Sequence, residues 1–225
     1  MPGSDRPRHS AGAQPERRPF RGWRFVLSAL LIAVVLASVL RATVVDIYFI
    51  PSESMQPLLE KGDRVLVSRL DGEPQRGDVV VCVGRGSFDP ISGSGPGEIL
   101  GTLGHWLGVS GSDTVYVKRI LGVGGDTVAC CSADGRLEIN GNPLDEPYVF
   151  PSDAPSDQEF EVEVPQGKLW VMGDHRSDSF DSRSLLGAPG GGLVSTDRVL
   201  GRAVQIVWPP SRFGPIERFP TTDLR

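Results

Sequence analysis

Cysteine is scarce in this sequence, whose 225 residues include only Cys82, Cys130 and Cys131. These three show none of the paired spacings that hold zinc, so we expect no metal site and no cofactor. An odd count outside the cytoplasm leaves at least one thiol free or paired with another chain. The adjacent Cys130 and Cys131 either form a vicinal disulfide or place one thiol inward and one outward on a strand, and we favour the second arrangement.

Histidine is equally scarce, which weakens the case for a Ser/His/Asp triad. His9 precedes a long apolar segment, His105 lies in an irregular stretch, and only His175 stands in a polar, motif-rich segment. A serine hydroxyl needs a neighbouring base to take its proton, but a neutral lysine can do this in place of histidine.

Aromatic residues make up only 7% of the chain, whereas glycine (28) and proline (19) are abundant. This balance favours short strands and many turns over long helices, so we expect a mainly β fold. About 180 residues follow the apolar segment, which is enough for one well-packed domain with a small appendage.

Positive charge is not in excess: the net charge is −5, and we expect no nucleic-acid partner. The arginines that precede the apolar segment are Arg6, Arg8, Arg17, Arg18, Arg21 and Arg24. By the positive-inside rule, such a cluster places the N-terminus in the cytoplasm and the body outside it.

Residues 25–40 carry no charge, and with their neighbours they reach the roughly 20 residues that a spanning helix needs. We therefore expect a single transmembrane anchor at 23–45, with Arg24 and Arg41 reaching the two interfaces. A cleavable signal peptide is the alternative, but the segment lacks a convincing small-x-small exit. The Pro- and Arg-rich residues 1–22 form a cytoplasmic tail that we expect to be disordered.

Beyond the anchor, alternating or β-branched runs bounded by turn signals predict a series of short strands. The expected strands are 44–50, 63–68, 77–83, 114–123, 127–131, 137–142, 167–174 and 199–208, the last closing the sheet. A glycine- and serine-rich stretch at 84–113 is expected to be a loop insertion. The glycine run at 190–192 reads as a flexible link.

Ser54 ends one expected strand region, and Lys118 lies within another. Alternation puts Lys118 on the same face as Tyr116 and Ile120, in a run that is otherwise apolar. Burial there would favour the neutral amine that a general base requires. The alternative is a lysine that points to solvent from a strand exposed on both sides.

Four segments together carry a resemblance to a known family. They are residues 51–59, 77–81, 116–126 and 173–183. In order and spacing they resemble bacterial type I signal peptidases, the membrane-bound Ser/Lys endopeptidases that remove signal peptides from exported preproteins. The resemblance spans most of the chain from the anchor to residue 183.

The resemblance implies roles for individual residues. Ser54 matches the nucleophile and Lys118 the general base, while the Ser52 hydroxyl and the Ser54 N–H match the oxyanion hole. Ser52 could instead only cap a turn. Ser179 matches the serine that orients the lysine, and Asp181 and Arg183 match a pair that holds this segment against the site; for that pair the alternative is a surface salt bridge. His175 replaces the family's usual asparagine, and we assign it no catalytic role.

The family cleaves after small residues, typically Ala-x-Ala, and this resemblance implies shallow apolar pockets. The matching residues are Ile50, Met55, Leu59, Tyr116 and Val117. Each could equally be plain core, Leu59 and Val117 above all. An extended signal-peptide segment would add as a strand beside the sheet edge.

The resemblance also implies two antiparallel β-sheet regions in an extracytoplasmic catalytic domain at 46–225, with a smaller β cap at 127–165. Signal peptides of secretory preproteins and membrane phospholipid are the expected partners, and we expect a monomer in the cell membrane. Two other functions were weighed. A self-cleaving Ser/Lys repressor would carry a DNA-binding domain where this chain has its apolar segment, and a non-enzymatic single-span binding protein would leave the Ser54 and Lys118 motifs unexplained.

Overall fold

The computed structural model describes residues 21–84 and 115–219. Most of the expected basic tail and nearly all of the expected insertion at 84–113, with His9 and His105, lie outside the described residues. The chain divides into two compact units, Met1–Leu40 and Arg41–Arg225.

A single α-helix, α1 (Arg21–Thr43), accounts for the described part of the first unit. Its apolar side chains face solvent, with exposed fractions from 50% at Leu27 to 74% at Phe25. Across the described ranges, no helix reaches the length and apolar character required of a membrane span.

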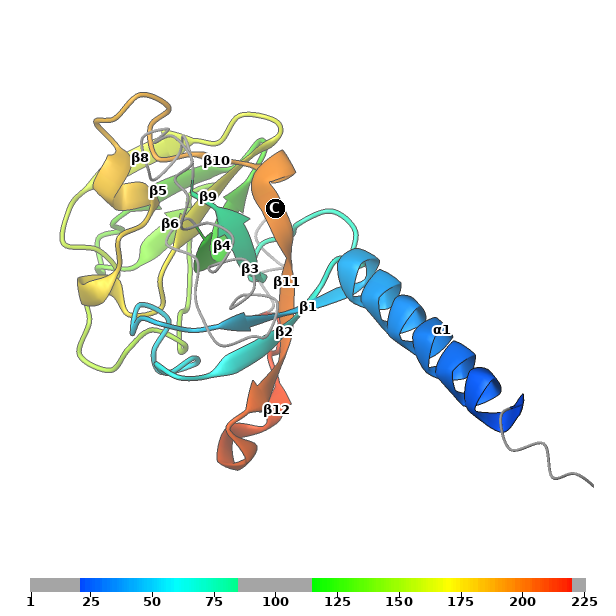
Figure 1. The fold of residues 1–225 in the computed structure, drawn as a ribbon. Coiled ribbons are helices and arrows are strands. Elements are labelled where there is room, and N and C mark those ends of the chain that lie inside the picture. Colours follow the sequence, from blue (N-terminus) through cyan, green and yellow to red (C-terminus); the bar gives the residue numbers. More distant parts are fainter. Residues whose placement is uncertain (1–20, 85–114, 220–225) are drawn as a thin grey trace, which may run out of the picture. The chain divides into compact units, whose positions relative to one another are not determined.

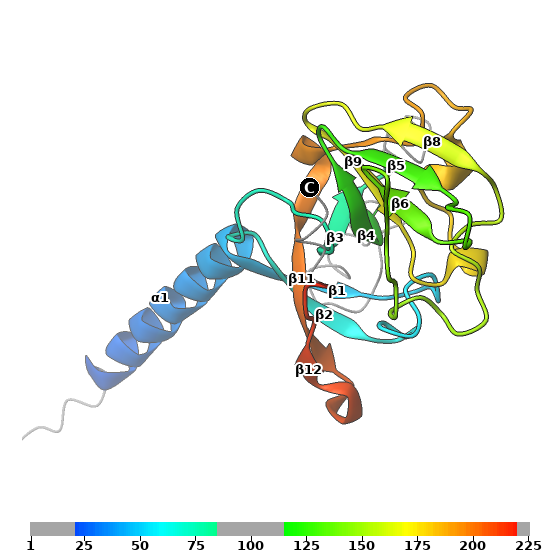
Figure 2. The ribbon, with the colours of Figure 1, turned by 180° about the vertical axis from the view of Figure 1, so that it is seen from behind.

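The second unit is built on a large antiparallel sheet (Figures 1 and 2). Its strands in spatial order are β1 (Val45–Phe49), β2 (Arg64–Ser68), β11 (Val199–Trp208), β3 (Val79–Val83), β4 (Val115–Val123), β9 (Lys168–Met172) and β10 (Val194–Ser195), and β12 (Gly214–Pro215) pairs with β11. The mainly β prediction is thus confirmed.

A smaller antiparallel sheet lies beside the large one, with β5 and β6 next to each other in both views (Figures 1 and 2). Its strands in spatial order are β7 (Asn142–Pro143), β6 (Leu137–Ile139), β5 (Thr127–Cys130) and β8 (Phe160–Glu163). The described residues of this unit also form four short 3-10 helices: η1 (Arg176–Asp178), η2 (Ser182–Leu185), η3 (Thr196–Arg198) and η4 (Pro210–Arg212).

Strand alternation divides the buried side chains among three hydrophobic clusters. In β2, the inward Val65 and Val67 join a cluster with Met55 and Leu59 on one face of the large sheet. A second cluster, on the other side of β3, contains Val80, Cys82, Ile120, Leu169, Val171 and Val194. The third joins the two sheets through Leu121 and Trp170, which pack against the core of the smaller sheet. Because β4 contributes to all three, its register fixes the centre of the unit.

Three features of the sheets differ from the sequence predictions. The strand at 199–208 does not close the sheet, because β11 lies between β2 and β3 and is followed by β12. The expected strand at 137–142 is two strands, since Asn140 and Gly141 adopt left-handed φ values of 54° and 76° and turn the chain. The short strands β8, β10 and β12 were not predicted.

The cysteines also differ from the favoured arrangement. Cys130 and Cys131 are joined as a vicinal disulfide, the alternative that we did not prefer, although Cys130 is buried and Cys131 exposed as expected of neighbours on a strand. Cys82 is a buried free thiol.

Candidate active site

Ser54 lies in a tight turn that follows β1. The turn is closed by main-chain hydrogen bonds from Gln56 to Glu53 and from Leu59 to Met55. Met55 and Leu59 are 1% and 0% exposed and pack into the core. These two side chains fix the turn, so that the Ser54 hydroxyl is presented from a rigid backbone.

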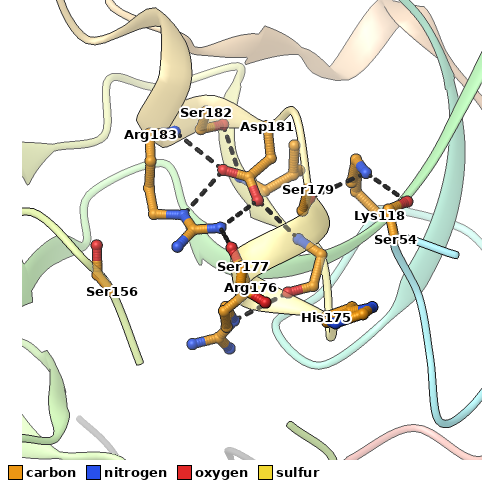
Figure 3. Close-up of polar contacts among 12 residues, drawn as sticks. Ser54, Lys118, Ser156, His175, Arg176, Ser177, Ser179, Asp181, Ser182 and Arg183 are labelled. Atoms are coloured by element: carbon orange, nitrogen blue, oxygen red, sulfur yellow. Dashed lines mark hydrogen bonds and ion pairs between the residues drawn. The ribbon is translucent and has the colours of Figure 1, made fainter. Parts of the chain in front are cut away.

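Lys118 reaches Ser54 from the middle of the large sheet. On β4, opposite Val80 of β3, it is 2% exposed. Its Nζ lies 2.8 Å from Ser54 Oγ and 3.1 Å from Ser179 Oγ (Figure 3). The solvent-facing alternative for Lys118 is therefore wrong.

Burial lowers the pKa of Lys118 from 10.5 to about 8, because the charged ammonium form loses its hydration. Asp181, Cys82 and Asp174 oppose this shift by favouring the cation, whereas Arg183 adds to it. A substantial share of the lysine is consequently neutral near physiological pH, and a neutral amine in contact with a hydroxyl can accept its proton.

A third segment, which follows β9, supplies Ser179, Asp181 and Arg183. The Asp181 carboxylate accepts hydrogen bonds from the Gly173 N–H at 3.0 Å and from the Arg183 guanidinium at 2.9 and 3.0 Å (Figure 3). Burial alone would raise the pKa of Asp181, but its hydrogen bonds with Arg183 and the charge of Arg183 hold that pKa below its usual value. Asp181 is fully buried and Arg183 is 6% exposed, so they form an interior ion pair rather than a surface salt bridge.

Gly173 lets this segment approach the serine turn. A Cβ at this position would collide with the Ser179 side chain and with the carbonyl oxygen of Ser54. The same carbonyl accepts a hydrogen bond from the His175 N–H at 3.1 Å. The backbone after β9 therefore packs directly on the backbone of Ser54, with no side chain between them.

Ser52 lies on the solvent side of Ser54. Its hydroxyl oxygen is 3.4 Å from that of Ser54, and the residue is exposed. A hydroxyl two residues before Ser54 is near enough to donate to an oxygen that develops beside Ser54 Oγ.

A cleft of about 410 Å³ opens beside Ser54 and Lys118. Four of the five residues expected in the substrate pocket line it, namely Ile50, Met55, Tyr116 and Val117. Leu59 does not, because its fully buried side chain belongs to the core below. The remaining lining residues, which the sequence reasoning missed, are Tyr48, Phe49, Pro51, Val115, Asp178 and Phe180.

Two further buried ion pairs support the segment after β9, and the sequence reasoning missed both. Arg119 pairs with Asp174 through contacts of 2.8 and 2.6 Å, and its guanidinium stacks 4.1 Å from the Tyr148 ring. Arg176 pairs with Glu146 at 2.6 Å. The available signal was the place of Arg119 between apolar residues in the strand at 114–123, since a buried cation requires an acidic partner.

The His175 ring takes no part in these contacts. It stacks on Phe150 at 4.1 Å, and its Nε2 lies 3.9 Å from the Asp153 carboxylate. Within residues 21–84 and 115–219, no group of histidine, cysteine and acidic side chains is arranged to hold a metal ion.

Comparisons with known proteins identify one family. Residues 23–208 match the family described as signal peptidase, peptidase S26. A probable signal peptidase I of Mycobacterium leprae is 37% identical over 90% of this chain and 81% of its own length. The signal peptidase I of Mycobacterium tuberculosis is 39% identical, covering 82% and 72% of the two chains.

Among solved structures, a signal peptidase I from Enterococcus faecalis aligns with 58% of this chain and 96% of its own, at 26% identity and a TM-score of 0.38. That score is too low for any argument about the fold. The sequence matches are sufficient by themselves: this chain belongs to the signal peptidase family, peptidase S26, and is a serine peptidase that cleaves signal peptides.

Proposed function

We propose that this chain is a membrane-anchored endopeptidase that cleaves after Ala-x-Ala with Ser54 as nucleophile and Lys118 as general base. The observation that carries the proposal is the 2.8 Å contact between Ser54 Oγ and a Lys118 amine that is almost wholly buried. With the amine neutral, its lone pair takes the Ser54 proton along this contact as Ser54 Oγ attacks the scissile carbonyl.

The remaining steps use the same groups. The Ser52 hydroxyl and the Ser54 N–H stabilise the negative oxygen of the tetrahedral intermediate. One such donor typically raises kcat by about 10²–10³-fold. The Lys118 ammonium then gives its proton to the departing amine of the mature protein, leaving the signal peptide esterified to Ser54. Lys118 next deprotonates a water molecule, which hydrolyses the ester and frees Ser54.

Ser179 holds the lysine amine in place for both transfers. Its hydroxyl contacts Lys118 Nζ at 3.1 Å and is hydrogen-bonded to the Asp181 carboxylate. Asp181 is in turn held by Arg183, which also donates to the Arg176 carbonyl at 2.8 Å. Asp181 and Arg183 are positioning residues in this scheme, because neither touches Ser54.

The cleft supports substrate selection by size. Ile50, Met55, Tyr116 and Val117 give it apolar walls next to Ser54. Among the described strands, β1 is the terminal one of the large sheet, and the pairing of β9 with β4 begins at Arg119. An extended signal-peptide segment would lie along β1 and the first half of β4, with small side chains in the apolar walls.

Anchoring by α1 completes the proposal. No described helix by itself meets the length and apolar character of a span. The support for a single span with the N-terminus in the cytoplasm is the uncharged run at residues 25–40 and the arginines before it. The catalytic domain, residues 46–225, would work as a monomer on the outer surface in contact with phospholipid, where emerging signal peptides leave the bilayer.

Replacement of either catalytic side chain is expected to abolish cleavage. Ser54→Ala and Lys118→Ala should each lower the processing rate by about 10⁶-fold, since the two residues act as a unit. The measurement is cleavage of a preprotein that ends its signal peptide in Ala-x-Ala, using the full chain in detergent.

The matched controls Ser211→Ala and Lys61→Ala change exposed residues outside the site and should keep the full rate. A second substrate, with leucine in place of both alanines, tests the cleft and should not be cut. Processing by either catalytic variant would sink the Ser/Lys assignment, whereas efficient cleavage of the leucine substrate would contradict the proposed specificity alone.

The pH dependence of catalysis should follow Lys118. Because the neutral amine is the active form and the pKa is about 8, kcat/KM should fall about tenfold per pH unit below pH 7 and level off above pH 8. A pH profile of cleavage at constant ionic strength measures this. A rate that stays flat from pH 5 to pH 9 would exclude lysine as the base.

Lys118 is expected to reduce the stability of the fold while enabling catalysis. Its folded pKa of about 8 lies below the unfolded value of 10.5, so the unfolded chain binds the extra proton between these limits. Lys118→Met should therefore raise the free energy of unfolding by about 1–3 kcal/mol at pH 7, the lost hydrogen bonds offsetting part of the gain. The gain should shrink as pH rises from 8 to 10.5.

Urea unfolding of the detergent-solubilised chain at pH 7 and pH 10 measures this difference. Lys61→Met is the matched control, because Lys61 is exposed and its replacement should change the free energy of unfolding little. A Lys118→Met chain that is less stable than the parent at pH 7 contradicts the expected cost of the buried lysine.

The anchor can be tested by placing charge in α1. Leu31→Arg combined with Val34→Arg should release the chain into the supernatant of an alkaline membrane extraction, because each central arginine costs about 2.5–3.5 kcal/mol on insertion. Leu31→Ile combined with Val34→Leu should leave it in the pellet. Extraction of the unaltered chain by the same treatment would rule out α1 as a membrane anchor.

A further inference from the structure

A second cavity, of about 330 Å³, lies away from Ser54 around the pairing of β9 with β10. The residues that line it are Lys168, Pro189, Gly190, Gly192, Leu193, Ser195, Asp197 and Arg198. None of them was assigned a role in the peptidase site.

Two cations converge on this cavity. Lys168 at the start of β9 is directly opposite Ser195 of β10, so their side chains share one face of the antiparallel ladder. Arg198 follows three residues later, at the end of η3. Within the part of the chain that the structure describes, neither cation has an ion-pair partner, and Arg198 Nη1 is buried without any hydrogen bond. A buried guanidinium nitrogen without an acceptor is costly, and an oxygen-rich ligand in this cavity would supply one.

Glycines form the opposite wall. Gly190, Gly191 and Gly192 all have left-handed φ values, of 95°, 60° and 74°, so the sequence expectation of a flexible link is replaced by a defined turn. The Gly192 carbonyl accepts a 2.8 Å hydrogen bond from Ser182 Oγ, and a Cβ on Gly192 would strike the Ser182 carbonyl. This wall presents backbone to the cavity and leaves room for a ligand close to it.

One acidic residue, Asp197, also lines the cavity. It is exposed, so water and salt screen its charge, whereas Lys168 and Arg198 are both partly buried. The lining therefore carries two partly buried basic side chains against one exposed acidic one.

From these features we infer that the cavity is a binding site for a phosphate group. Lys168, Arg198 and Ser195 all line the cavity and together offer several hydrogen-bond donors, which suits the several acceptor oxygens of a phosphate. Since one water occupies about 30 Å³ of liquid, the cavity has space for a phosphate that carries a substituent. Inorganic phosphate and an anionic phospholipid headgroup share this chemistry.

The bound phosphate would brace the segment that carries Asp181 and Arg183. Ser182 joins the glycine wall to the large sheet, because its hydroxyl donates to the Gly192 carbonyl and accepts from the Val171 N–H at 3.0 Å. The inference rests on this cavity alone and does not depend on the roles proposed for Ser54 and Lys118.

Isothermal titration of the full chain in non-ionic detergent with inorganic phosphate, at constant ionic strength, tests the site. We expect binding that Lys168→Gln and Arg198→Gln each weaken by at least about tenfold, the equivalent of one charge-assisted hydrogen bond. Arg136→Gln removes an exposed arginine that pairs with Asp134 outside the cavity, and it should leave binding unchanged. Lys168→Arg keeps the charge and should retain binding. Unchanged cleavage in phosphate-free buffer shows that the variants fold.

A second arm identifies the source of the phosphate. The same proteins are reconstituted in vesicles of phosphatidylglycerol or of phosphatidylcholine, and their Tm values are compared. If phosphatidylglycerol raises the Tm of the parent and of Arg136→Gln but not that of Lys168→Gln or Arg198→Gln, the site is assigned to a lipid headgroup. If inorganic phosphate binds with the same pattern of variants, the site is assigned to the free anion. If neither probe acts, or if all variants respond alike, the inference is overturned.

Discussion

The hydrogen bond between Lys118 and Ser54 is the contact on which the rest of this structure depends. In the proposed mechanism the lysine must be neutral, so its amine must be kept from water. The amine is buried because Lys118 lies on β4, the strand that contacts all three hydrophobic clusters. Three separate elements then meet at one nitrogen: the turn after β1 brings Ser54, β4 brings Lys118, and the segment after β9 brings Ser179. Close packing makes this meeting rigid, which matters because small displacements of reacting groups are costly in rate.

The buried ion pairs can be understood through the same requirement. Asp181 and Asp174 both favour the protonated lysine, whereas Arg183 opposes it. Each carboxylate pairs with an arginine, Asp181 with Arg183 and Asp174 with Arg119, at distances of 2.6–3.0 Å. This pairing offsets part of the negative charge that each carboxylate brings near the amine. Buried pairs of this kind contribute geometry more than stability.

Local patterns in the sequence were enough to predict the strands with strict alternation or unbroken β-branched runs, such as β2, β3 and β4. They also placed Lys118 in an otherwise apolar run, but they left open whether its side chain is buried or faces solvent. What they could not supply was long-range order. No local pattern around Val199 indicates that β11 pairs between β2 and β3. Likewise, Arg176 pairs with Glu146, which lies 30 residues away along the chain. The strands β10 and β12 contain two residues each, too few to show a period. The core position of Leu59 likewise follows from the turn that it anchors.

β1 is the terminal strand of the large sheet, and Ser54 follows it directly. A terminal strand that could pair with an extended substrate could equally pair with another strand, including β1 of a second copy. The strand limits this hazard by its length of five residues and by carrying the charged Asp46. If the substrate pairs with β1 as proposed, self-association through β1 would compete with it for the same backbone groups. A high local concentration of the enzyme would then lower its rate of cleavage.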